Sequence, residues 1–112
     1  MELTGRYAKL RDDVIAALEV GREAERANPD DGGAYNFDSA SIKLPRWKKA
    51  LVEQALREAG TRGWVWFSYG GSRWVISPDT RGHCNARSRN SEAMTRALSE
   101  MGYDAFEYCA LD

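Results

Sequence analysis

Apolar residues recur every three or four positions near the N-terminus, at Leu3, Tyr7, Leu10, Val14 and Leu18. This spacing places them on one stripe of an amphipathic helix, which we predict over residues 3–27. The helix is expected to end near Asn28-Pro29, because proline disfavours the helical conformation in the residue before it. The two aspartates and two glycines at 30–33 then read as an exposed loop.

A second helix is predicted over residues 45–59, after a segment at 35–44 that has no helical period and is expected to be extended. Pro45 suits the first turn of a helix, where its missing N–H has no partner to lose. The residues that follow at steps of four include Trp47 and Leu51, and Gly60 provides a C-terminal cap.

The strongest strand signal is a hairpin formed by residues 64–69 and 73–77. Both segments are rich in aromatic and β-branched residues, and Gly70-Gly71 between them suits a tight turn. Trp64 and Trp66 share one face of this hairpin by alternation. Core packing is one role for them; an exposed aromatic face would instead indicate a partner or an oligomer.

The remainder predicts a loop, a helix and a strand. Residues 78–89 are polar and aperiodic and are expected to form a long loop. Asn90 or Ser91 can cap a third helix that ends at Gly102, and residues 103–111 form a final strand. The sequence therefore predicts one α+β domain over 1–112, with a small antiparallel sheet of three or four strands packed against three helices.

Composition is that of a globular domain, with 112 residues and a hydrophobic fraction of 43%. No apolar run approaches the roughly 20 residues that cross a bilayer, and the first residues lack a signal peptide's apolar segment, so we expect a cytoplasmic protein without a membrane partner. Cys84 and Cys109 are too few for a disulfide framework and are expected to be reduced.

Charge is segregated along the chain although the net charge is only −1. Residues 1–41 carry five basic and nine acidic groups, residues 42–89 ten and three, and residues 90–112 one and five. The basic middle, which includes Arg46, Lys48 and Lys49, either is neutralised by the acidic ends or forms a surface that faces an anion.

Two polar clusters are the candidate binding site. The first lies in the predicted loop before the third helix and comprises Arg81, His83, Asn85, Arg87 and Arg89. Guanidinium groups and helix N-termini attract anions, so this stretch can hold phosphate; the alternative is a solvated loop that pairs with the acidic ends.

The second cluster is Asn36, Asp38 and Ser39, and the side chains of Asn36 and Asp38 share a face if the segment is extended. Together with the arginine loop they would form a polar pocket, whereas the alternative for Asp38 is a turn cap. The sequence does not reveal whether the two clusters meet.

Catalytic chemistry lacks a motif. The chain contains no P-loop or dinucleotide fingerprint. His83 and Cys84 point to opposite sides of an extended backbone, which is poor geometry for a nucleophile and its base; His83 with Asp38 as orienter is the remaining arrangement. We therefore expect no catalytic residue, no metal and no cofactor.

Several short motifs resemble small uncharacterised accessory proteins of phages and integrative elements of gut-type bacteria. They are Tyr35-Asn36-Phe37-Asp38-Ser39, Ser77-Pro78 with Gly82 and Asn85, Glu92-Ala93-Met94, Gly102-Tyr103-Asp104-Ala105 and Leu111-Asp112. The resemblance covers residues 33–112 and implies an inhibitor of a host defence such as CRISPR. The resulting expectation is a non-enzymatic binding protein with a protein or ribonucleoprotein partner; the alternative is a nucleic-acid or nucleotide-binding protein that uses its basic loop.

Overall fold

The computed structural model describes residues 1–28, 32–33, 36, 38–68, 71–80 and 84–109, and these contain three helices and four strands. Along the chain the elements are α1 (Gly5–Ala27), β1 (Ser39–Ile42), α2 (Lys49–Glu58), β2 (Gly63–Ser68), β3 (Gly71–Ile76), α3 (Asn85–Glu100) and β4 (Ala105–Tyr108). The predicted α+β class, with three helices and a small antiparallel sheet, is confirmed.

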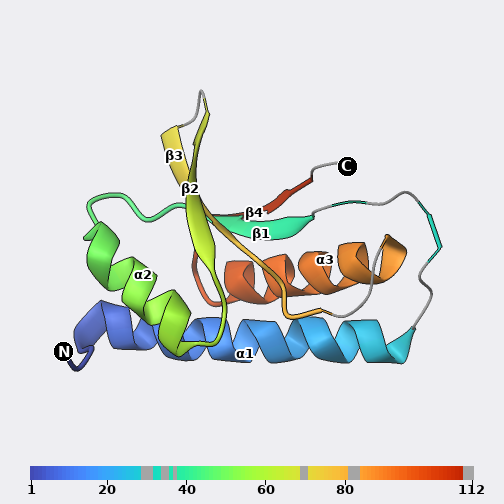
Figure 1. Ribbon diagram of the computed structural model, residues 1–112, viewed down its shortest axis with the longest axis horizontal. Coiled ribbons are helices and arrows are strands. Elements are labelled where there is room, and N and C mark those ends of the chain that lie inside the picture. The colour runs from blue at the N-terminus through green and yellow to red at the C-terminus, as the bar shows by residue number, and fades with distance from the viewer. Residues whose placement is uncertain (29–31, 34–35, 37, 69–70, 81–83, 110–112) are drawn as a thin grey trace.

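All strand pairs are antiparallel, and the sheet order is β2-β3-β1-β4. From β1 onward the connectivity is β-α-β-β-α-β, which is the split βαβ arrangement of ferredoxin-like folds, with α1 added in front. In Figure 1, α3 runs beneath β1 and β4, and α1 runs beneath α3. The helices therefore cover one face of the sheet and leave the other uncovered.

The core lies between the helices and the inner face of the sheet. The predicted stripe of α1 is buried at Leu10, Val14 and Leu18, and alternate strand residues such as Ile42 and Ile76 face it. Apolar residues four positions apart on the helix and two positions apart on the strands thus pack together in one hydrophobic cluster.

The second helix begins later than predicted. Pro45 and Arg46 form a turn, Arg46 has a φ of 66°, and α2 starts at Lys49. The Trp47 ring packs 5.3 Å from the Tyr7 ring and beneath the Arg6 guanidinium, 4.4 Å away. This aromatic contact with α1 holds the segment in a turn that the local pattern did not reveal.

The third helix, by contrast, begins earlier than predicted, because its N-cap is Cys84 and not Asn90 or Ser91. It starts at Asn85, so Arg87 and Arg89 lie in its first turns and not in a loop. Asn90 and Ser91, either of which we expected to be the cap, lie within the helix, and their side chains are fully buried. In these first turns most of the buried positions are held by polar side chains, which hydrogen-bond to neighbouring segments, and not by apolar residues at helical spacing.

The hairpin is confirmed, with β2 and β3 paired from Gly63↔Ile76 to Ser68↔Gly71. Gly71 is the first residue of β3, not part of the turn, and its φ of 101° suits glycine. The predicted turn residue Gly70 lies outside the described residues.

Gly60 and Gly102 follow α2 and α3 with positive φ, as predicted for helix caps. None of the described helices combines the length and the apolar character needed to cross a membrane.

Candidate functional site

The two predicted polar clusters meet at the start of α3. The Asn36 side-chain amide donates to the Cys84 carbonyl oxygen at 2.8 Å and to Ser88 Oγ at 3.1 Å. Ser88 Oγ in turn donates to Asp38 Oδ2 at 2.8 Å. Asn36 and Asp38 are both buried, so this network faces the interior.

Arginine side chains of α3 extend the network along β1. Arg87 Nε donates to the Asp38 carbonyl oxygen at 2.8 Å, and its terminal nitrogen reaches Ser39 Oγ at 3.3 Å. Ser91 Oγ donates to the same Asp38 carbonyl at 2.8 Å. Arg89 donates to the carbonyl of Asn28, at the end of α1.

Asn85 also serves the chain's own fold. Its backbone N–H donates to the Gly32 carbonyl at 2.9 Å, and a β carbon on Gly33 would lie 2.3 Å from its Oδ1. Arg81 and His83 lie outside the described residues. The described members of the predicted site therefore hold the chain together, by attaching Asn28, Gly32, Asn36, Asp38 and Ser39 to the start of α3.

An acidic cluster at the end of β4 was missed by sequence reasoning because Asp38 lies about 70 positions before Glu107 and Cys109. Oxygens of Asp38 and Glu107 and the Cys109 sulfur lie within 4.8 Å of one another. Burial, Asp38 and Glu92 raise the pKa of Glu107, and burial, Asp38 and Glu107 raise the pKa of Cys109. These donors could hold a divalent cation, but the raised pKa of Cys109 disfavours the thiolate that ligates metals.

The uncovered face of the sheet carries a contiguous aromatic surface, which we call the aromatic face: Trp64, Trp66, Phe106 and Tyr108. Their strands are the two edges of the sheet, and the Tyr108 ring lies edge-on 5.2 Å from each tryptophan ring. Small residues on the strands between, such as Ser41, leave room for these rings. Trp64 and Trp66 share a face, as predicted. The sequence did not indicate that Tyr108 of β4 packs against both of them.

Exposure distinguishes this surface from a core. Trp64 is 45% exposed, Trp66 38% and Phe106 64%. Val75, which pairs with Trp64 on the neighbouring strand, is fully buried although no helix covers this face. The aromatic rings therefore cover the central strands and are themselves open to contact.

Arg73 fastens the aromatic face to the sheet beneath it. Its Nε donates to Ser41 Oγ at 3.0 Å, a terminal nitrogen donates to the Asp104 carbonyl at 2.8 Å, and its guanidinium lies 4.8 Å from the centre of the Phe106 ring. Because Arg73 is buried and so connected, it orders Phe106 and supplies no free charge. Beside it is a hollow of about 430 Å³ lined by Ser41, Lys43, Trp66, Arg73, Asp104, Phe106 and Glu107.

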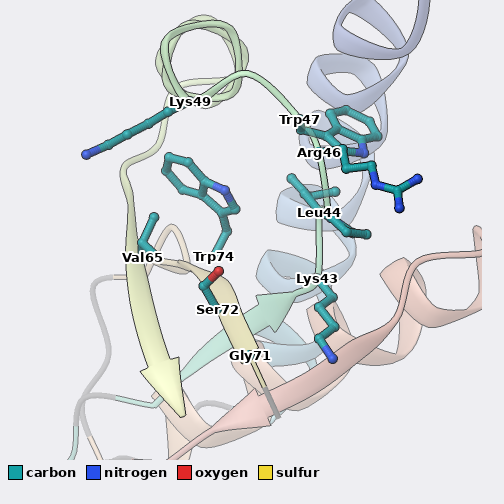
Figure 2. Close-up of a pocket in the computed structure, with 10 residues that line it drawn as sticks. Lys43, Leu44, Arg46, Trp47, Lys49, Val65, Gly71, Ser72 and Trp74 are labelled. Carbon is teal, nitrogen blue, oxygen red and sulfur yellow. The ribbon is translucent and has the colours of Figure 1, made fainter. Parts of the chain in front are cut away.

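A second hollow of about 450 Å³ lies on the other side of the hairpin, beside the 43–49 connection. Figure 2 shows the Trp74 indole inside it and Lys43, Arg46 and Lys49 around its rim, pointing in different directions. Lys49 Nζ lies 3.9 Å from Glu53 Oε1. Lys43 and Arg46 have no carboxylate partner within the described residues. This basic rim is one part of the predicted basic middle segment that stays open.

Comparisons with known protein families, curated proteins and solved structures find no match. The split βαβ topology is shared by proteins of many activities and does not define a function. The features of this chain that indicate a function are the chemistry of the two hollows and of the aromatic face.

Proposed function

We propose that this chain is a non-enzymatic binding protein that binds a protein partner through its aromatic face. The supporting observation is that Trp64, Trp66, Phe106 and Tyr108 form one surface across the sheet from edge to edge, in which the first three are exposed. Tryptophan, tyrosine and arginine carry most of the binding energy in protein interfaces. Because the strands hold these rings in place, little side-chain entropy is lost on binding.

Charge favours a protein over a nucleic acid at this face. The hollow beside the rings is lined by two acidic residues, Asp104 and Glu107, against Lys43 and Arg73. Arg73 is already engaged with Asp104. A nucleic acid needs an excess of cations to replace the counterions of its phosphates, and in this hollow two carboxylates offset two cations.

The proposal agrees with the accessory proteins of phages and integrative elements that residues 33–112 resemble. A protein of that kind would act in the cytoplasm and block a host defence such as CRISPR by covering a protein or ribonucleoprotein component. The site we propose for this role is the aromatic face, in place of the arginine cluster that the sequence suggested.

The test is affinity capture from a nuclease-treated bacterial lysate, with mass spectrometry of the retained proteins. Phe106→Ala removes an exposed ring of the face, and Ile15→Ala on α1, where Ile15 is 44% exposed, is the matched control. A stoichiometric partner retained by the wild type and by Ile15→Ala, but lost with Phe106→Ala, is the expected result. A partner retained equally by all three would exclude the aromatic face.

Nucleic-acid or nucleotide binding is the second candidate, and the basic rim in Figure 2 is the observation that favours it. Titration of a single-stranded oligonucleotide would then show affinity that falls steeply with salt. Arg46→Glu should weaken that binding, whereas Arg96→Glu, on the exposed side of α3, should not. Binding that is insensitive to salt or to Arg46→Glu would remove this candidate.

A further inference from the structure

Strand β2 is an edge of the sheet with unpaired backbone groups. Arg62 is the residue immediately before β2, and its carbonyl accepts a hydrogen bond from Ser77 N at 3.0 Å. Arg62 and Ser77 are therefore a hydrogen-bonded pair of the ladder. In an antiparallel ladder such pairs alternate, so Trp64 and Trp66 exchange bonds with β3. The N–H and C=O groups of Gly63, Val65 and Phe67 therefore point outward, and within the described part of the chain they have no partner.

This edge lacks the features that keep edge strands from pairing. From Gly63 to Ser68 the residues are Gly-Trp-Val-Trp-Phe-Ser, with no charged residue and no proline. Natural proteins usually protect a free edge with lysine, proline, a bulge or a short strand. The opposite edge, β4, is shorter and carries Glu107. Strand β2 thus differs from a protected edge and is suited to accept another strand.

We propose that the strand it accepts is β2 of a second copy of this chain, antiparallel about a twofold axis at Val65. In that register Val65 lies opposite Val65 of the second copy, and Gly63 lies opposite Phe67. All the outward backbone groups then fall in hydrogen-bonded pairs, because Gly63, Val65 and Phe67 are the residues that face the edge. Trp64 lies opposite Trp66 on the uncovered face, an aromatic cross-strand pair of the kind that stabilises sheets.

The fit of Phe67 is what favours a second copy over an unrelated strand. Phe67 is 78% exposed and, by alternation, lies on the same side of β2 as Gly63. On that side, beside Gly63, is a hollow of about 420 Å³ lined by Glu53, Leu56, Arg57, Thr61, Arg62 and Gly63.

Gly63 itself cannot supply a side chain to this hollow. A β carbon there would lie 2.4 Å from Leu56 Cδ1. The proposed register brings Phe67 of the second copy directly opposite Gly63, where its ring covers the glycine and enters the hollow. The twofold axis repeats the contact, so each copy gives one ring and receives one. Since the strand is uncharged, its pairing with itself meets no electrostatic repulsion.

The test is the mass of the purified protein by sedimentation equilibrium over about a hundredfold range of concentration, because a dimer is favoured by mass action. The expected mass rises from the 12.6 kDa of one chain toward twice that value. Phe67→Lys should return the protein to the single-chain mass. Ile15→Lys, which places the same cation on α1 away from this edge, should not, and circular dichroism should show both variants folded, since Phe67 is 78% exposed and Ile15 44%.

Hydrogen exchange of the wild type provides an independent measurement that needs no variant. The amides of Gly63, Val65 and Phe67 should exchange slowly at high concentration and quickly at low concentration. A single-chain mass throughout the range, equal weakening by Phe67→Lys and Ile15→Lys, or fast exchange of these amides in the dimer would each overturn the proposal. None of these outcomes depends on the protein partner proposed for the aromatic face.

Discussion

Gly21 of α1 lies directly against Asn90 of α3, so closely that a β carbon on Gly21 would be 2.0 Å from Asn90 Oδ1. Asn90 is fully buried, and its side-chain amide donates to Glu25 Oε1 at 3.1 Å and to the Asp79 carbonyl at 3.0 Å. One polar side chain thereby joins α1, α3 and the segment after β3. The absence of a side chain at Gly21 is what allows the two helices to approach this closely.

Replacing Gly21 by alanine is expected to lower the free energy of unfolding by about 1 to 3 kcal/mol, because the added methyl overpacks a closed contact. Urea unfolding measures the loss. In the double variant Gly21→Ala/Asn90→Ala the clash is absent, so the combined loss should be smaller than the sum of the two single losses. Simple additivity would contradict the contact.

Arg73→Lys is expected to cost about 1 to 3 kcal/mol, although the charge is kept. An ammonium cannot reach Ser41 and Asp104 together in the way the planar guanidinium does, and it loses the stacking on Phe106. The same exchange at Arg96, whose side chain is largely exposed and pairs with Glu92, should change stability by less than about 0.5 kcal/mol. Equal unfolding midpoints for the two variants would contradict the anchoring role of Arg73.

Arg87→Ala should lower the free energy of unfolding by about 1 to 2 kcal/mol, since it removes the bonds from Arg87 to the Asp38 carbonyl and Ser39 Oγ. Arg96→Ala on the same helix is the matched control. Thermal unfolding followed by circular dichroism makes the comparison. If Arg87→Ala is as stable as the control, the link between α3 and β1 does not depend on this side chain.

Stability is expected to fall as the pH rises through the range just above 4.5, the ordinary pKa of Glu107. The folded protein raises this pKa by burial and by the nearby Asp38 and Glu92, so it holds the Glu107 proton more tightly than the unfolded chain does. The unfolded state therefore deprotonates first, and the stability that the protonated carboxyl supplies is lost as the pH passes the folded pKa.

Glu107→Gln removes this titration and should raise the melting temperature at neutral pH. The gain should be well below about 1 kcal/mol, because Glu107 is exposed enough for solvent to screen the repulsion. Melting temperatures from about pH 4 to about pH 8 test this, with Glu100→Gln as the control for loss of one charge. A variant less stable than the wild type at neutral pH would show that the carboxylate has a favourable contact.

Periodic apolar patterns predicted most of the fold. The stripe from Leu10 to Leu18 identified α1, and the aromatic segments around Gly70-Gly71 identified the hairpin, because hydrophobic period is a local property of the chain. The start of α3 was predicted too late for the same reason. Its first turns are held by Ser88, Asn90 and Ser91 through hydrogen bonds to distant segments, and such bonds leave no apolar period in the sequence.

Three features of the candidate surfaces were beyond local patterns. Tyr108 reaches Trp64 and Trp66 only because β4 and β2 are the two edges of one twisted sheet. From the sequence we expected the arginines before the third helix either to bind an anion or to pair with the acidic ends of the chain, yet Arg87 donates to the backbone carbonyl of Asp38. The free edge of β2 follows from the order of the strands in the sheet. That order is set by pairing between segments far apart in the sequence.

The sequence by itself determined the class of fold, the three helices, the hairpin and the shared face of Trp64 and Trp66, since each depends on the spacing of residues within one segment. Only the tertiary structure decided which polar residues became internal connections and which aromatic residues stayed exposed. That outcome depends on contacts between residues tens of positions apart, and the energies of such contacts are set by geometry that no local pattern encodes.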